Sequence, residues 1–122
     1  MKSRRPKIAL VDDDPLVLTP LVEALTQEGC EILSAADGVE ALAIFEREAV
    51  DLAIIDVALP GHLDGIALAR EVKQHKPDLR IIFMSGKPPP DADLEQLGIF
   101  LLKPTRLSAL LDAIGRVLGR AD

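Results

Sequence analysis

Five short runs of apolar residues recur along the chain, separated by segments long enough to form helices. The runs cover residues 8–11, 32–33, 52–55, 81–84 and 99–102. Three of them are almost purely apolar and do not alternate with polar residues. Strands of a parallel sheet that is covered on both faces have this pattern, because neither side of the strand meets water. The runs are therefore predicted to be strands of a parallel sheet.

Helix signals lie between and after these runs. Asp37 and Glu40 have the Asp-x-x-Glu spacing of a capping arrangement, so a helix is predicted to start at Asp37. After Thr105, apolar residues recur at steps of three and four, which places one apolar stripe against the sheet. This stripe consists of Leu107, Leu110, Leu111, Ile114, Val117 and Leu118. The last segment is therefore predicted to be an amphipathic helix.

Prolines shape two further connecting segments. Asp14 followed by Pro15 is typical of a cap and a first helical residue, but Pro20 removes a backbone donor within the same helix. A kink or a late start is expected there. Between the fourth and fifth strands, the prolines at 88–90 leave room only for a short helix over residues 91–97. The helix in this position is therefore expected to be shortened or irregular.

Five strands that alternate with helices predict an α/β fold. Right-handed crossovers give a doubly wound parallel sheet with helices on both faces. In the flavodoxin-like strand order, 2-1-3-4-5, the first and third strands flank the point where the winding reverses, and ligands bind beyond the carboxyl ends of the strands. Residues 1–6 are expected to form a flexible N-terminal tail, and residues 7–120 a single domain.

Acidic residues directly follow two of the predicted strands. Asp12, Asp13 and Asp14 come after the first run, and Asp56 comes after the third. Because these two strands flank the switch point of the predicted sheet, their carboxylates should converge in one crevice and repel one another. A hard divalent cation relieves such repulsion, and Mg²⁺ binds through one or two carboxylates together with waters and a phosphate group. The sequence therefore predicts a Mg²⁺ site.

Ser85 and Lys103 follow the fourth and fifth strands in the same way. They add a hydroxyl donor and a fixed positive charge. A transferred phosphoryl group spreads negative charge over its equatorial oxygens, so a metal, a hydroxyl and a lysine around one carboxylate form a charge clamp. The carboxylate can itself be the nucleophile and form an aspartyl phosphate. The residue set therefore favours phosphoryl transfer to an aspartate.

Four motifs, met in chain order, resemble those of response-regulator receiver domains. They are Val11-Asp12-Asp13-Asp14-Pro15, Asp56 through Leu59-Pro60 to Asp64-Gly65, Met84-Ser85-Gly86, and Phe100-Leu101-Leu102-Lys103-Pro104. The motifs span nearly the whole chain, and together they form a specific signal. The resemblance implies that residues 7–120 are a receiver domain. Such a domain accepts a phosphoryl group from a phosphohistidine of a histidine kinase or histidine phosphotransfer protein, and it is not an enzyme beyond its own phosphorylation and dephosphorylation.

The resemblance also assigns the acidic residues. It implies that Asp56 is the phosphoacceptor. By the same resemblance, Asp13, Asp56 and the backbone carbonyl of Ala58 ligate Mg²⁺, and Asp12 contacts the ion through water. Asp14 and Asp64, in contrast, are expected to be ordinary cap or turn residues.

Further roles follow from the resemblance at the fourth and fifth strands. Ser85 matches the switch hydroxyl, and Phe100 matches the switch aromatic. Lys103 matches the lysine that pairs with the phosphoryl group. Pro104 matches the proline after a cis peptide bond, so the Lys103–Pro104 bond is implied to be cis.

Composition restricts the partners and the compartment. The formal net charge is −6 and the chain has neither Trp nor Tyr, which argues against direct binding of nucleic acid. No apolar run approaches the roughly 20 residues of a membrane span. The chain has a single cysteine, Cys30, and no secretory signal pattern at its start, so a cytoplasmic location is expected. Cys30 itself is expected to be buried at the start of the second strand.

Two alternatives remain open on the sequence. In a haloacid-dehalogenase-like phosphohydrolase, Asp12 would attack phosphate and Asp14 would act as acid or base; the short chain leaves little room for a substrate cap. The other alternative is a flavodoxin-like or receiver-like binding module that recognises a partner without phosphorylation. A flavin site would need a phosphate-binding loop rich in hydroxyls and glycines after the first strand, where this chain has carboxylates.

Overall fold

A five-stranded parallel sheet forms the centre of the computed structural model, which describes residues 5–119. Its strands are β1 (Lys7–Val11), β2 (Glu31–Ala35), β3 (Leu52–Asp56), β4 (Arg80–Ser85) and β5 (Ile99–Leu102). They lie in the order β2-β1-β3-β4-β5, and each neighbouring pair is parallel. This order is that of the flavodoxin-like fold and confirms the predicted topology.

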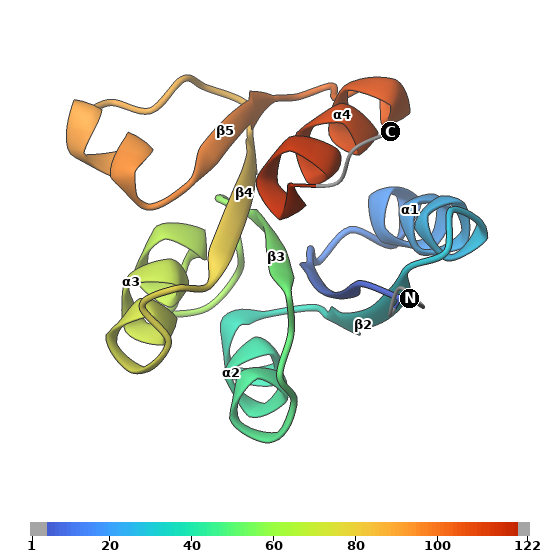
Figure 1. Ribbon diagram of the computed structural model, residues 1–122. Coiled ribbons are helices and arrows are strands. Elements are labelled where there is room, and N and C mark those ends of the chain that lie inside the picture. The colour runs from blue at the N-terminus through green and yellow to red at the C-terminus, as the bar shows by residue number, and fades with distance from the viewer. Residues whose placement is uncertain (1–4, 120–122) are drawn as a thin grey trace.

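Helices cover both faces of the sheet. They are α1 (Pro15–Gln27), α2 (Gly38–Arg47), α3 (Gly65–His75) and α4 (Leu107–Leu118), with a short 3₁₀ helix, η1 (Ala92–Gln96), between β4 and β5. Figure 1 shows α1 and α4 on one side of the sheet and α2 and α3 on the other. Across residues 5–119, no helix combines the length and the apolar character needed to cross a membrane.

The core consists of two apolar layers, one on each face of the sheet. Alternate strand residues point to opposite faces, so Val11 and Ile55 pack toward α2 and α3, whereas Leu10 and Ile54 pack toward α1 and α4. All five residues of β3 are buried, which explains why this strand is apolar without alternation until Asp56. The polar residues of the central strands are thereby displaced to the strand ends.

Aspartate side chains cap three helices that follow strands. Asp14 Oδ1 accepts a hydrogen bond from Leu16 N at 3.0 Å. Asp37 Oδ1 accepts from Glu40 N at 2.8 Å, which confirms the predicted cap. Asp64 Oδ1 accepts from Ala67 N at 2.8 Å. Each bond satisfies a backbone donor that the helix itself leaves free, so these acidic residues fix where α1, α2 and α3 begin.

Prolines had different effects in the two segments where they were noted. Helix α1 begins at Pro15 and continues through Pro20, so the expectation of a late start is wrong. Asp14 caps the first turn, and Pro15 needs no helical donor at that position, which together allow the early start. Between β4 and β5, the only helical element is η1, as the prolines at 88–90 predicted.

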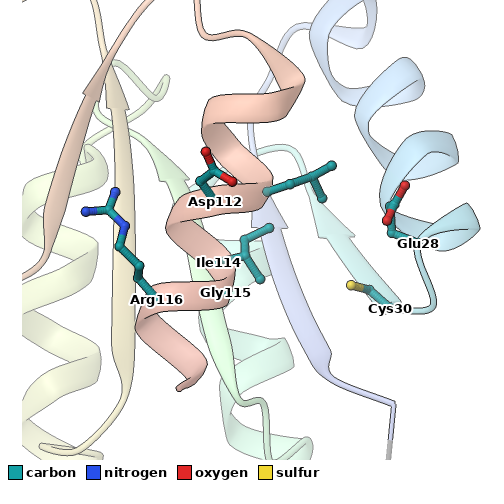
Figure 2. Close-up of a pocket in the computed structure, with 7 residues that line it drawn as sticks. Glu28, Cys30, Asp112, Ile114, Gly115 and Arg116 are labelled. Carbon is teal, nitrogen blue, oxygen red and sulfur yellow. The ribbon is translucent and has the colours of Figure 1, made fainter. Parts of the chain in front are cut away.

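Cys30 is buried directly before β2, as expected. It borders a cavity of about 460 Å³ that lies between α4 and the turn joining α1 to β2 (Figure 2). The other residues around this cavity are Glu28, Leu111, Asp112, Ile114, Gly115 and Arg116. None of the residues predicted to carry phosphoryl chemistry lines it, so the candidate site lies elsewhere.

The cap of α2 gives a test of how the helices are anchored. Asp37→Ala should lower the free energy of unfolding by about 1 kcal/mol, because Glu40 N loses its partner. Asp37→Asn retains an acceptor oxygen and should cost only a few tenths of a kcal/mol. Urea unfolding at neutral pH measures both. Equal losses in the two variants would contradict the capping role.

Candidate functional site

The residues predicted to carry chemistry lie at the carboxyl ends of four strands. Asp12 follows β1, Asp56 ends β3, Ser85 ends β4, and Lys103 follows β5. The register pairs Val11 of β1 with Ile55 of β3. This pairing brings the next residue of each strand, Asp12 and Asp56, to the same point on the edge of the sheet.

Three carboxylates form one cluster at this edge. Oxygen atoms of Asp12, Asp13 and Asp56 lie within 4.8 Å of one another. Asp12 is fully buried and Asp56 is 4% exposed, whereas Asp13 faces solvent. The predicted convergence of the acidic residues is therefore present in the structure, with one of the three carboxylates open to water.

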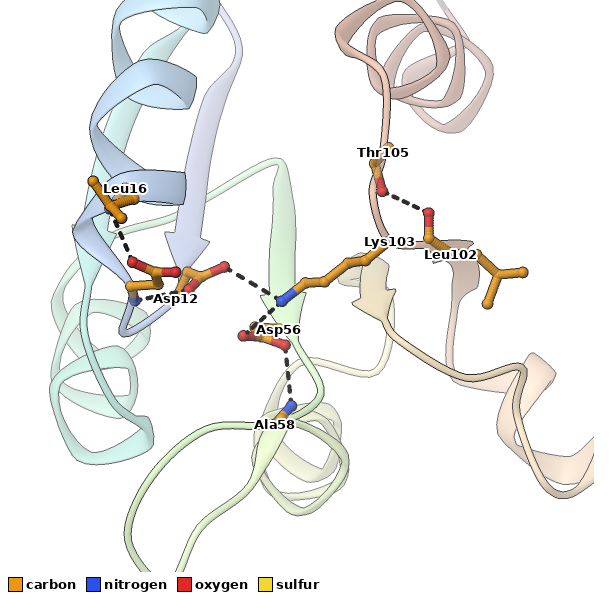
Figure 3. A network of polar contacts seen from close by, with 8 residues as sticks. Asp12, Leu16, Asp56, Ala58, Leu102, Lys103 and Thr105 are labelled. Atoms are coloured by element: carbon orange, nitrogen blue, oxygen red, sulfur yellow. Dashed lines mark hydrogen bonds and ion pairs between the residues drawn. The ribbon is translucent and has the colours of Figure 1, made fainter.

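Lys103 supplies the positive charge of the site. Its Nζ lies 3.0 Å from Asp56 Oδ2 and 4.0 Å from Asp12 Oδ2 (Figure 3). The lysine side chain is about one-third exposed, so it reaches the two buried carboxylates from the open side of the sheet edge. The ion pair with Asp56 joins the ends of β3 and β5, which are separated in the sheet by β4.

Backbone groups hold the two buried carboxylates in place. Asp12 Oδ1 accepts a hydrogen bond from Asp14 N at 2.9 Å. Asp56 Oδ1 accepts from Ala58 N at 3.1 Å. Each carboxylate thus has one oxygen fixed by the loop that follows its own strand, and its other oxygen, Oδ2, is directed toward Lys103.

The carboxylate of Asp12 is the least favourably placed of the three, because its charge is buried. Its Oδ2 atom is buried and has no hydrogen-bond partner. Burial is the main reason that the pKa of the Asp12 carboxyl lies above its ordinary value, and the charges of Asp56 and Asp13 raise it further. The Asp14 N–H and the Lys103 charge act in the opposite direction. Three carboxylates in one cluster with a single nearby lysine leave excess negative charge, which a bound divalent cation would offset.

Ser85 does not bond to the carboxylates in this structure. Its buried hydroxyl accepts a hydrogen bond from Lys87 N at 3.1 Å and donates to Lys87 O at 2.7 Å. The Ser85 carbonyl accepts from Lys103 N at 2.8 Å. Ser85 is therefore connected to Lys103 through the backbone, while its side chain is held within its own loop.

Phe100 lies in β5 and is half-buried. Its ring stacks on Phe83 of β4, with 4.6 Å between the ring centroids and an angle of 28° between the planes. The two residues are direct partners in the register of β4 and β5. The peptide bond between Lys103 and Pro104 is cis.

Asp14 has a structural role, which bears on the phosphohydrolase alternative. Asp14 Oδ1 is the acceptor of the α1 cap, and the side chain lies outside the carboxylate cluster. The proposed nucleophile of that alternative, Asp12, is fully buried. Of the two buried carboxylates, Asp56 is the closer to Lys103 Nζ, at 3.0 Å. These contacts favour Asp56 over Asp12 as the reacting residue.

Two features near the site were not predicted from the sequence. The Lys87 backbone binds the Ser85 hydroxyl, and a pattern of residue types cannot show which rotamer a serine adopts. Gly65 lies against the backbone of Asp56. The sequence signal for Gly65 is the Asp64-Gly65 pair, which shows no role for the glycine by itself.

The unfavourable burial of the Asp12 charge predicts a gain in stability when that charge is removed. Asp12→Asn should raise the free energy of unfolding at pH 7, without divalent cations, by on the order of 1 kcal/mol. A raised folded-state pKa means that wild-type protein loses stability relative to the variant as pH rises above the ordinary Asp value of 3.8 and through the folded-state pKa. The difference should therefore shrink in acid.

Urea unfolding over a series of pH values measures this effect. Asp112→Asn, at an exposed position of α4, is the matched control for loss of one acidic charge. An Asp12→Asn variant that is less stable than wild type, or a difference that is constant with pH, would contradict the electrostatic account.

Comparison with known proteins agrees with the fold. The family model for the response regulator receiver domain matches residues 8–115. The transcriptional regulatory protein GlrR of Escherichia coli is 35% identical to 97% of this chain, which spans 27% of the length of GlrR. The sporulation initiation phosphotransferase F of Bacillus subtilis is 31% identical, over 92% of this chain and 93% of its own length.

A solved structure shows the same architecture. The response regulator protein TrrA of Thermotoga maritima, in complex with Mg²⁺-BeF, superposes with a TM-score of 0.84 at 30% identity, over 93% of this chain and 99% of TrrA. The matched family model covers most of the chain, and the strand order is that of the flavodoxin-like fold. The chain therefore belongs to the response regulator receiver domains, the phosphoacceptor modules of two-component signalling.

Proposed function

We propose that Asp56 accepts a phosphoryl group from a phosphohistidine of a histidine kinase or a histidine phosphotransfer protein. In this reaction an oxygen of Asp56 forms a bond to phosphorus while the bond from phosphorus to the imidazole nitrogen breaks. The electron pair of the broken bond stays on the imidazole, which takes a proton from water. The observation that carries the proposal is the 3.0 Å ion pair between Lys103 Nζ and Asp56 Oδ2, beside a buried Asp12 oxygen that has no hydrogen-bond partner.

The side chains around Asp56 suit the charge that the reaction moves. Lys103 can turn from the Asp56 carboxylate toward the oxygens of an incoming phosphoryl group, because its side chain is partly exposed. The Ala58 N–H fixes Asp56 Oδ1, so the carboxylate keeps its orientation when the lysine leaves. A nucleophile held in one orientation in this way reacts faster than one that must first be oriented.

Asp12, Asp13, Asp56 and the backbone carbonyl of Ala58 are proposed to hold Mg²⁺. The buried Asp12 Oδ2 without a hydrogen-bond partner and the all-oxygen donor set suit a hard cation. TrrA, a relative of the same fold, is described in complex with Mg²⁺-BeF, which supports this choice of metal. When bound, Mg²⁺ neutralises part of the charge that the carboxylates and the phosphoryl group bring together.

Ser85 and Phe100 are proposed to transmit the phosphorylated state. A phosphoryl group on Asp56 offers new acceptor oxygens at the sheet edge. The Ser85 hydroxyl would then give up its two hydrogen bonds to Lys87 and donate to one of the phosphoryl oxygens. Phe100 is stacked on Phe83 and is only half-buried, so its ring can respond to a shift at the end of β4. The response is expected at residues 85–87 and 100–105, because the prolines at 88–90 restrict the loop that follows.

Exposed apolar side chains support a protein as the phosphodonor. The large hydrophobic residues that are exposed in the described chain are Leu16, Val39, Leu102 and Leu107. All four lie at the starts of helices or the end of a strand on the carboxyl edge, where Asp56 lies. Any donor must approach Asp56 from this edge, since the sheet and its helices cover the other directions. Apolar residues around an acidic centre suit a protein surface that carries a phosphohistidine.

The domain and its surroundings complete the proposal. Residues 7–120 are proposed to be the receiver domain, with residues 1–6 as a tail; residues 1–4 and 120–122 lie outside the described part.

As a receiver domain, the chain is a signalling module, and we propose that it catalyses only its own phosphorylation and dephosphorylation. The net charge of −6 disfavours direct binding of nucleic acid, and a cytoplasmic location fits exchange with a histidine kinase.

Phosphorylation of Asp56 can be tested with a small-molecule phosphodonor. Wild-type protein with acetyl phosphate and Mg²⁺ should gain the mass of one phosphoryl group, which fragmentation should place on Asp56. Asp56→Asn should gain none, because an amide is a poor nucleophile. Asp112→Asn is the control and should be phosphorylated normally. Label on Asp12, or label retained in Asp56→Asn, would overturn the assignment. A wild-type protein that never becomes phosphorylated would favour the binding-module alternative.

The metal assignment predicts a difference between two neighbouring aspartates. Asp13→Ala should weaken Mg²⁺ binding by roughly ten-fold or more and slow phosphorylation, because it removes one of the proposed ligands. Asp14→Asn removes the same charge one residue further on, keeps a capping oxygen for α1, and should bind Mg²⁺ nearly as wild type does. Titration calorimetry with MgCl₂ measures both. Equal effects in the two variants would mean that only the local charge matters.

A further inference from the structure

Gly65, the first residue of α3, packs against the backbone of the proposed phosphoacceptor. A Cβ atom at this position would lie 2.3 Å from the carbonyl oxygen of Asp56 and 2.7 Å from the Cα of Val57. Both neighbours are backbone atoms, so no rotation of a side chain could relieve the overlap. The first turn of α3 can therefore lie this close to the end of β3 only because residue 65 has no side chain.

Hydrogen bonds hold the first turn of α3 in this position. The Gly65 N–H donates to the Val57 carbonyl at 3.0 Å. Asp64 caps the same turn through Ala67 N, at 2.8 Å. Gly65 is buried, so the contact lies inside the packed structure and cannot relax into solvent. The peptide that links Asp56 to Val57 is thus fixed from the side of α3.

The position of this peptide determines where the Asp56 carboxylate lies. The aspartate side chain is short, so its carboxylate follows any movement of its Cα. In the structure this carboxylate lies 3.0 Å from Lys103 Nζ and 3.1 Å from Ala58 N. It must also share a cluster with Asp12 and Asp13 within 4.8 Å. Because a Cβ would lie only 2.3 Å from the Asp56 carbonyl oxygen, the backbone would have to shift to admit it, and that shift would move these atoms apart together.

We propose that Gly65 is a positioning residue for phosphorylation: by letting α3 lie against the Asp56 backbone, it sets the carboxylate at the place where Lys103 and a metal ion can act on it. This proposal rests on the proposed function, since it concerns the reactivity of Asp56. Gly65 has no side chain to offer the site and would act only through the backbone of Asp56.

Gly38 provides a matched comparison within the same chain. It is the first residue of α2, it follows a capping aspartate as Gly65 does, and a Cβ there would also be too close to its neighbours. Those neighbours belong to Leu63, whose Cδ2 would lie 2.8 Å away and whose carbonyl oxygen 2.9 Å away. An alanine at position 38 therefore disturbs packing and stability without pressing on Asp56.

The experiment compares Gly65→Ala, Gly38→Ala and Gly115→Ala with wild type. Position 115, in α4, has open space around a Cβ, so Gly115→Ala controls for the substitution itself. Three quantities are measured on each protein: the free energy of unfolding, the Kd for Mg²⁺, and the rate constant of phosphorylation by acetyl phosphate at saturating Mg²⁺. The rate is normalised to the folded fraction, so that loss of stability alone does not change it.

Gly65→Ala should slow phosphorylation at saturating Mg²⁺ by roughly ten- to hundred-fold and should weaken Mg²⁺ binding, because misplacement of reacting groups by about 1 Å can cost about a hundred-fold in rate. Gly38→Ala should lose stability but keep a rate within about two-fold of wild type. A Gly65→Ala protein with wild-type rate and Mg²⁺ affinity would overturn the proposal. Equal slowing in Gly65→Ala and Gly38→Ala would overturn it too, since it would show a general effect of destabilisation.

A second variant covers the case in which Gly65→Ala does not fold. Asp64→Ala removes the bond to Ala67 N that fixes the first turn of α3, and adds no atom near Asp56. It should slow phosphorylation several-fold, whereas Asp37→Ala, the equivalent change in α2, should not. Equal rates in these two variants would overturn the proposal.

The Mg²⁺ measurement separates this proposal from the proposed function. If wild-type protein takes no phosphoryl group, the proposed function fails, while the comparison of Mg²⁺ affinities between Gly65→Ala and Gly38→Ala still tests whether Gly65 positions the carboxylate. If wild-type protein is phosphorylated on Asp56 and Gly65→Ala reacts equally fast, the proposed function stands and the positioning role of Gly65 fails.

Discussion

The ion pair between Lys103 and Asp56 connects the chemistry of this protein to its fold. It can form because a parallel sheet buried on both faces places the polar residues of its central strands at one edge. Two carboxylates are buried beside each other, and the lysine partly neutralises their negative charge. Its backbone N–H binds the Ser85 carbonyl, so β4 and β5 are also joined next to the charge. Lys103 thus connects the ends of β3, β4 and β5.

Strand positions and the acidic cluster could be predicted from the sequence because both depend on simple rules. Buried strands are recognisable from their apolar runs, and strand order brings Asp12 and Asp56 together whatever their side-chain conformations. The cap at Asp37 was predictable for a similar reason, since residue spacing determines which N–H it can reach. Helix α1 was harder, because Asp14 and Pro15 favour an early start and Pro20 opposes helix formation, and sequence does not show which effect is larger.

Features that depend on side-chain rotamers or on close backbone contacts could not be predicted. Ser85 was expected to act at the site, yet its hydroxyl is bound to Lys87 within the loop, a choice that depends on local geometry. Gly65 was recognised as part of a motif, but its contact with Asp56 depends on how closely α3 approaches β3. The raised pKa of Asp12 likewise follows from burial, and the sequence suggests this burial only because Asp12 follows an apolar strand.

Helix α1 shows a consequence of placing prolines beside an acidic site. Pro20 has no N–H, so the carbonyl of Leu16 lacks the usual donor four residues later, and the first turn depends strongly on the Asp14 cap. Leu16 is 85% exposed and adds little packing. The first turn thus relies on hydrogen bonds to Asp14, whereas Leu25, further along α1, is buried in the core. The first turn of α1, next to Asp12 and Asp13, is thus held by contacts that are separate from those of the sheet.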